Sequence, residues 1–137
     1  MSSYKRNQNS NQQVVNLDAF SSSLESIFKE YANSVDEALA DGLKEGAKVA
    51  AQEWRNGAKS AFNGDKYWRS IRRKFVNVKD APYSVVYSTI PGLPHLLENG
   101  HATIGGGRVA GRTHIKPAAE SGFDTAYKKA KEEIEKL

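Results

Sequence analysis

The chain contains no cysteine, a single methionine and only four prolines among its 137 residues. Without cysteine it can form neither disulfide bonds nor the thiolate ligands of a zinc or iron–sulfur site. No apolar run approaches the ~18 residues that a membrane span needs, and the N-terminus lacks the apolar segment of a signal peptide. We therefore expect a protein made in the cytoplasm, with no membrane partner and one apolar core, which a chain of this length can form unaided.

Positive charge is concentrated in one short segment. Residues 55–79 contain eight Lys/Arg against one Asp/Glu, whereas residues 1–54 contain five against eight, and residues 80–137 contain seven of each. The basic segment includes Arg69, Arg72, Arg73 and Lys74. Such a cluster favours a surface that faces nucleic acid, and these four residues are our candidates for lining a DNA channel. It is equally compatible with a solvated strand face, or with a partner for the acidic first helix.

Hydrophobic periodicity predicts a long first helix. Residues 1–13 are polar and rich in Ser, Asn and Gln, which predicts a flexible arm before a single domain over residues 14–137. Apolar residues, Leu24 and Ile27 among them, then recur in steps of three and four from Leu17 to Trp54, and Gly57 is expected to end the helix. Such a helix is ~60 Å long, so it must break or protrude. Gly42 and Gly46 mark either a bend or a close helix contact.

The rest of the chain predicts two strands and a second helix. Residues 66–79 and 82–90 are rich in Trp, Tyr, Val, Ile and Phe, with a turn between them at residues 79–82. A second helical stripe follows Pro117 and runs to Leu137. The expected fold is α+β, with a long N-terminal helix and a C-terminal helix packed on a small antiparallel sheet, and a long Gly-rich loop projecting from one edge.

That loop, from Pro91 to Pro117, is where we expect function to lie. It contains all three histidines and six of the eleven glycines of the chain. Compact domains rarely keep a connection of this length unless it is functional. Residues 106–113 fit the spacing of a phosphate-binding loop, with Arg112 in place of the usual lysine. They lack the preceding buried strand and the following helix, which argues against a nucleotide site.

The spacing of His95, Glu98 and His101 allows two interpretations. A short helix would bring the three side chains near one face, as in a metal site or an acid–base pair. Alternatively, these groups bond the loop backbone and fix its ends, while Leu96 and Leu97 anchor the segment in the core. We favour the second interpretation and expect no metal, no cofactor and no catalysis.

The order of motifs in the loop resembles the small tail-completion, or head-to-tail joining, proteins of long-tailed bacteriophages, also described as neck, minor capsid or tail-component proteins. The resemblance covers roughly the last three quarters of the chain, and the residues that carry it are His95, Leu96, Leu97, Glu98, Gly100, His101, Gly106, Gly107, Arg108, Gly111, Arg112, His114, Ile115 and Pro117. Thr113 stands where these proteins often have proline, and Asn99 where they often have an aromatic or apolar residue.

The resemblance implies a structural virion protein of the neck. Such proteins form a homo-oligomeric ring, commonly of six copies, between the head connector or stopper and the tail tube or tail terminator, and they leave a channel for passing DNA. Our candidate subunit contacts are Leu24 and Ile27 in the first helix and Arg108 and Arg112 in the loop. The alternative is a small DNA-binding regulator that uses residues 55–79. A metal-dependent hydrolase using His95, Glu98 and His101 ranks third.

Overall fold

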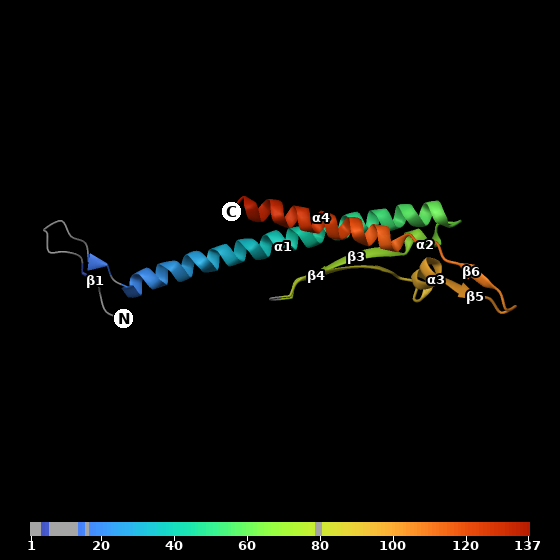
Figure 1. Ribbon diagram of the computed structural model, residues 1–137, viewed down its shortest axis with the longest axis horizontal. Helices are drawn as coiled ribbons and strands as arrows, with labels where there is room; N and C mark the ends of the chain where they lie inside the picture. Colours follow the sequence, from blue (N-terminus) through green and yellow to red (C-terminus); the bar gives the residue numbers. More distant parts are fainter. Residues whose placement is uncertain (1–3, 6–13, 16, 79–80) are drawn as a thin grey trace.

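The computed structural model describes Tyr4–Lys5, Val14–Val15, residues 17–78 and residues 81–137. The fold is α+β: two long helices lie side by side, and a two-stranded antiparallel sheet packs beneath them (Figure 1). Of the arm predicted over residues 1–13, only Tyr4–Lys5 are described. They form β1, which pairs antiparallel with β2 (Val14–Val15). The prediction of flexibility for the arm falls on residues outside the described ranges.

The first helix, α1 (Leu17–Ala61), has 45 residues and is longer than predicted. Gly57 does not end it. This prediction was wrong, because the glycine serves a packing contact inside the helix. A Cβ atom on Gly57 would lie only 3.1 Å from the Cβ of His114, so a small residue is needed there. At 1.5 Å per residue the helix spans ~68 Å, and its N-terminal part extends well past the end of α4 and past the sheet (Figure 1).

The second long helix, α4 (Ile115–Glu135), runs antiparallel to α1 at very short range. A Cβ on Gly46 would stand 2.6 Å from the carbonyl oxygen of Gly122, and one on Gly42 would stand 2.7 Å from that of Ala126. Of the two roles predicted for Gly42 and Gly46, close helix contact is therefore the one found. Small residues let the two backbones touch, so dispersion contacts between main chains replace the usual interlocking of large side chains.

The sheet consists of β3 (Ile71–Val76) and β4 (Tyr83–Ser88), with Ile71 opposite Ser88 and Val76 opposite Tyr83. The first strand was predicted to begin at Lys66, but Lys66–Arg69 form the short helix α2. Two local features explain the difference: Gly64 takes a positive φ of 82°, and the Ser70 hydroxyl bonds the Tyr67 carbonyl at 2.5 Å, which closes a helical turn. Residues 79–80 of the predicted turn lie outside the described ranges.

The two faces of the sheet differ sharply. Ser84, Val86 and Ser88 face the helices, and the Ser84 hydroxyl donates to the Leu43 carbonyl at 2.9 Å. The opposite face is exposed except at Val76, which is partly buried. We call it the outer sheet face; by strand alternation and register it consists of Arg72, Lys74 and Val76 on β3 and Tyr87, Val85 and Tyr83 on β4.

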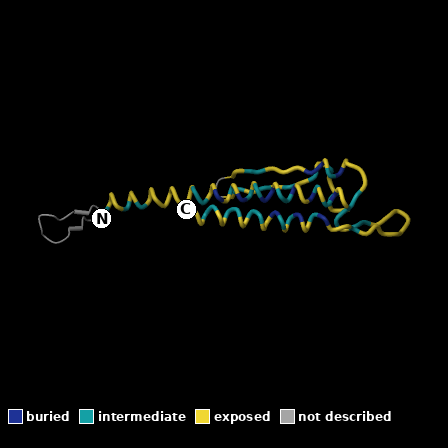
Figure 2. The backbone as a smooth tube through the Cα atoms, turned by 90° about the horizontal axis from the view of Figure 1, so that it is seen from above, coloured by how far each residue is buried: buried dark blue, intermediate teal, exposed yellow. Residues whose placement is uncertain are grey.

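The core is small and lies at one end of α1. It contains Ala51, Trp54, Ala58, Tyr67, Ile71 and Ala118. The first buried residue of α1 is Ala38, and the helix before it is mostly exposed (Figure 2). Among the described helices, none is long and apolar enough to cross a membrane.

The Gly-rich loop is more ordered than predicted. It contains α3 (Leu93–Asn99) and a hairpin of β5 (Gly100–Ala102) and β6 (Arg108–Ala110), and the hairpin projects from the end of the molecule where the core lies (Figure 1). At the tip of this hairpin the Thr103 N–H donates to the Gly107 carbonyl at 2.8 Å, which closes the turn. Ile104, within the turn, is fully exposed.

Candidate functional site

Glu98, at the end of α3, caps the first turn of α4. Its Oε1 accepts the backbone N–H of His114 at 2.7 Å and that of Ile115 at 2.9 Å, and its Oε2 accepts that of Lys116 at 3.0 Å. These N–H groups have no partner inside the helix, and a carboxylate there also interacts favourably with the helix dipole. One side chain thereby ties the start of the loop to its end.

His114 continues this contact into the core. Its Nδ1 lies 2.9 Å from Glu98 Oε1 and 2.7 Å from the Arg112 carbonyl, and its Nε2 lies 2.6 Å from the Tyr67 hydroxyl. That hydroxyl accepts the indole N–H of Trp54 at 2.8 Å. Every polar group is satisfied if the imidazole carries its proton on Nδ1, because Tyr67 then donates to Nε2. Trp54, Tyr67 and His114 are all buried, so this chain of hydrogen bonds joins α1, α2 and α4 beneath the surface.

The base of the loop is held by two further contacts. Arg112 donates from its guanidinium to the carbonyl of Ala61, the last residue of α1, at 2.7 Å, and from its backbone to the Leu97 carbonyl at 2.9 Å. Gly100 and Gly111 lie so close to the opposite strand that a Cβ on either would collide with backbone atoms. We call this assembly the loop clamp: Glu98, Gly100, Gly111, Arg112 and His114.

The pKa values of Glu98, in the clamp, and of Tyr67, next to it, are shifted from their usual values. Burial opposes ionisation of Glu98, but the N–H groups of Ile115, His114 and Lys116 and the His114 ring outweigh it, so the pKa of Glu98 is below its usual value. Burial raises the pKa of Tyr67; the Trp54 N–H opposes this rise, and the negative charge of Glu98 adds to it.

We predict that Glu98→Gln destabilises the protein at neutral pH by about 1–3 kcal/mol, because an amide replaces the charge that accepts three backbone N–H groups. The pKa of Glu98 is lower in the folded chain than in the unfolded chain. Its contribution is therefore complete above the unfolded value of ~4.3 and is lost as the pH falls through the folded value.

Urea denaturation followed by circular dichroism from pH 7 to pH 3 measures this contribution. The stability difference between wild type and Glu98→Gln should shrink as the pH falls. Glu120→Gln, an exposed substitution on α4, is the matched control and should follow the wild-type curve throughout. A Glu98→Gln curve parallel to that of wild type at every pH would show that the carboxylate charge does not hold the clamp.

The structure does not bring His95, Glu98 and His101 together. Glu98 is engaged with His114 and the α4 backbone, whereas His95 Nδ1 lies 3.0 Å from the Asn99 amide. His101 lies on β5, and its buried Nδ1 has no hydrogen-bond partner. No group of three His, Cys, Asp or Glu side chains suited to a metal is found in the described part of the chain. The structure therefore does not bring together the three side chains on which the hydrolase interpretation depends.

The remaining loop residues divide between clamp and tip. Leu97 and Ile115 pack against the core as expected, but Leu96 does not: it is 41% exposed, because consecutive residues of α3 point in different directions and only Leu97 of the two faces the core. Arg108 donates to the Asn99 carbonyl at 3.2 Å, so both loop arginines bond carbonyls of their own chain. Gly105 and Gly106 lie in open space at the tip, and Pro117 is in the first turn of α4.

The four basic channel candidates are spread over two faces. Arg69 pairs with Asp65 at 3.1 Å, both largely exposed. Arg72 and Lys74 are on the outer sheet face, whereas Arg73 is on the other side of the strand opposite Val86. The guanidinium of Arg72 donates to the carbonyls of Arg69 and Ile71, which fix its position without neutralising its charge.

The subunit-contact candidates in α1 lie on its protruding part. Ile27 is 58% exposed and Leu24 is half-buried. Neighbouring apolar side chains share the same stripe and are similarly exposed: Phe20 at 54%, Phe28 at 66% and Tyr31 at 53%. The sequence predicted this apolar stripe, and the single chain leaves it exposed.

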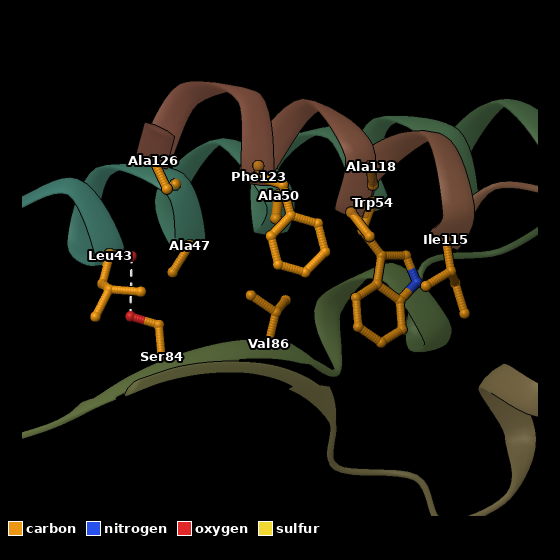
Figure 3. A pocket seen from close by; sticks show the side chains of 13 residues that line it. Leu43, Ala47, Ala50, Trp54, Ser84, Val86, Ile115, Ala118, Phe123 and Ala126 are labelled. Atoms are coloured by element: carbon orange, nitrogen blue, oxygen red, sulfur yellow. Dashed lines mark hydrogen bonds between the residues drawn. The ribbon is translucent and has the colours of Figure 1, made fainter. Parts of the chain in front are cut away.

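An apolar groove of about 250 Å³ lies between the helices and β4 (Figure 3). Trp54, Val86 and Phe123 point into it, and its only side-chain polar group besides the Trp54 indole is the Ser84 hydroxyl. Both groups are already used, by Tyr67 and by the Leu43 carbonyl. Ligand pockets combine an apolar lining with free polar groups that orient the ligand. This groove has the apolar lining but no free polar side chain that would orient a ligand.

Sequence reasoning missed the buried partners of the clamp. Tyr67 and Trp54 were interpreted as strand and helix-stripe residues, although each has a polar atom that needs a partner when buried. That requirement, together with a histidine next to a predicted helix start, is the signal that could have indicated the network. Comparisons of the chain with family models, with curated proteins and with solved structures find no match.

Proposed function

We propose that this protein is a structural component of a bacteriophage neck. Copies assemble into a ring, six being the number that the resemblance implies, which completes the tail, joins it to the head connector and leaves a channel for DNA. The ring needs no cofactor, and its expected partners are the connector or stopper on one side and the tail tube or tail terminator on the other. Its place is the virion, after synthesis in the bacterial host.

The observation that carries the proposal is the exposed apolar stripe of α1. Phe20, Ile27, Phe28 and Tyr31 all keep more than half of their surface in solvent. Contiguous apolar surface of this kind is uncommon on monomers and marks a surface that another molecule covers. In a closed ring the contact is head-to-tail, so each copy offers this stripe to a different surface of the next copy.

The loop clamp supports the same function. Its contacts occur at the base of the loop, so they hold the β5–β6 hairpin in a fixed direction while the tip stays exposed. A rigid arm ending in Ile104 suits a contact between subunits or with the next ring, because little conformational entropy is lost when it docks. Deletion of Gly105–Arg112 would remove two clamp residues, Gly111 and Arg112, as well as the tip, so we expect it to disturb the fold of the single chain.

The size of the purified protein in solution tests the proposal. By multi-angle light scattering, we expect a discrete oligomer that persists from low salt to about 0.5 M, because apolar burial is insensitive to salt screening. The alternative, a small DNA-binding regulator using residues 55–79, predicts a species that binds duplex DNA with affinity falling steeply as salt rises. A monomer at every concentration with steeply salt-dependent DNA binding would contradict the neck assignment.

A further inference from the structure

Two surfaces of this chain complement each other but lie too far apart to meet within one copy. The first is the protruding segment of α1, which we define as Leu17–Glu37, the part before the first buried residue, Ala38. The second is the outer sheet face. Figure 1 shows the protruding segment extending away from β3 and β4, so these two surfaces can meet only between copies.

Their charges are opposite. The protruding segment contains five Asp/Glu and one Lys, a net charge of −4. The outer sheet face carries Arg72 and Lys74 on β3 and no acidic residue, and β4 contains no charged residue. Opposite charges on the two partners speed their encounter and fix how they are oriented.

Their apolar surfaces also correspond. On β4 a row of Tyr83, Val85 and Tyr87 is exposed by 47%, 38% and 41%. On β3, Lys74 lies opposite Val85 and Arg72 lies opposite Tyr87, so a basic row runs beside the apolar row. A surface built in this way fits a helix whose apolar stripe is bordered by carboxylates.

The protruding segment is such a helix. At 3.6 residues per turn, Glu25 and Glu30 lie roughly 110° to either side of the centre of the Phe20–Tyr31 stripe. The stripe from Phe20 to Tyr31 rises by ~17 Å, and a six-residue strand is ~20 Å long, so the two rows have matching lengths. Either Glu25 or Glu30 can therefore lie along the basic row of β3 while the stripe covers the apolar row of β4.

We propose that the protruding segment of α1 in one copy binds the outer sheet face of the next copy. The proposal rests on the ring proposed above and names its interface. It also reassigns Arg72 and Lys74 from the DNA channel to a contact with the acidic helix of a neighbour. DNA offers phosphates to these two residues but nothing that covers Val85 or the α1 stripe, whereas a second copy covers both.

A charge exchange between the two surfaces tests this interface. In the helix variant, Glu25→Lys and Glu30→Lys are combined; in the sheet variant, Arg72→Glu and Lys74→Glu are combined. Each variant alone places like charges at every contact of the ring, so each should remain monomeric at concentrations at which wild type assembles. Both should keep the wild-type circular dichroism spectrum, since all four side chains are exposed.

Mixing the two variants in equal amounts should restore assembly. The helix variant then binds the sheet variant through exchanged charges, and the sheet variant binds the helix variant through the native ones, which gives an alternating ring. A control variant with Glu120→Lys and Glu135→Lys on α4 carries the same change in charge as the helix variant and should assemble like wild type.

The other results each overturn the interface. If wild type assembles and both variants also assemble alone, the copies meet elsewhere; the interface is then wrong while the neck function stands. If the variants stay monomeric after mixing although both are folded, the two surfaces do not bind each other. If wild type itself never assembles and its Arg72→Glu, Lys74→Glu variant loses only DNA binding, the interface and the ring both fail, and the outer sheet face is a DNA site.

Discussion

Gly46→Leu is expected to lower the free energy of unfolding by about 3 kcal/mol or more, the upper range for overpacking. The first added atom, Cβ, would stand 2.6 Å from the Gly122 carbonyl oxygen and 2.7 Å from the Ala126 Cβ. Because the obstacles are a backbone atom and a short, rigid side chain, no rotamer change relieves the clash. The two helices must move apart, and the contacts along their whole length weaken with them.

Lys48→Leu is the matched control for this substitution. Lys48 lies two residues further along α1 on its exposed side, so leucine there adds an apolar side chain with little change in helix propensity and without entering the α1–α4 contact. Urea denaturation followed by circular dichroism compares the two variants at one protein concentration. An unchanged midpoint for Gly46→Leu would mean that the helices do not pack backbone to backbone.

Ile27→Asp is expected to abolish assembly and leave the fold intact. Ile27 is 58% exposed in the single chain, so its loss removes little intrachain packing. In an assembled ring it loses an apolar burial of about 1.5–3 kcal/mol and places a carboxylate in the contact, which weakens each interface by at least roughly 10-fold. We prefer it to Leu24→Asp, because Leu24 is half-buried and its replacement also affects the chain itself.

Ser26→Asp separates the effect of the stripe from the effect of added charge. Ser26 lies next to Ile27 in sequence but roughly 150° away from the stripe centre around the helix. We expect the Ser26 variant to assemble like wild type in light scattering, whereas the Ile27 variant elutes as a folded monomer. An Ile27→Asp protein that still forms the wild-type oligomer would remove the α1 stripe from the interface.

The two long helices and the β3–β4 sheet were predictable because their sequence signals are local. A stripe with a spacing of three and four residues specifies a helix wherever it packs, and Tyr83–Ser88 alternates as a strand must. The sequence did not reveal which face of that strand is buried, since Tyr83, Val85 and Tyr87 are the more apolar set and yet are exposed. Small serines on the other face permit the sheet to approach α1, as the Ser84 contact with the Leu43 carbonyl illustrates.

The loop contacts could not be predicted from local sequence patterns, because they join residues that are far apart in the chain. Gly57 has the local properties of a helix end, but a residue from the far side of the loop, His114, explains why a glycine is there. Likewise, Glu98 was expected to bond backbone, and it does, but its partners lie 16–18 residues away at the start of α4. Nothing in the spacing of His95, Glu98 and His101 indicates that contact, because it depends on how two elements meet in space.

The buried core and the exposed apolar stripe lie at opposite ends of α1. The buried residues gather around Trp54 and the clamp, at the loop end of α1, while the other end of that helix keeps its apolar stripe in solvent (Figure 2). A chain that required only a stable monomer would gain nothing from the second feature. This arrangement is why we assign it to an assembly.

Electron microscopy of phage particles made with and without this protein tests the central claim most directly. If the protein joins heads to tails, particles made without it will accumulate as separate filled heads and free tails, and addition of the purified protein will restore joined particles with a ring of density at the neck. Complete, joined particles in its absence would contradict the account.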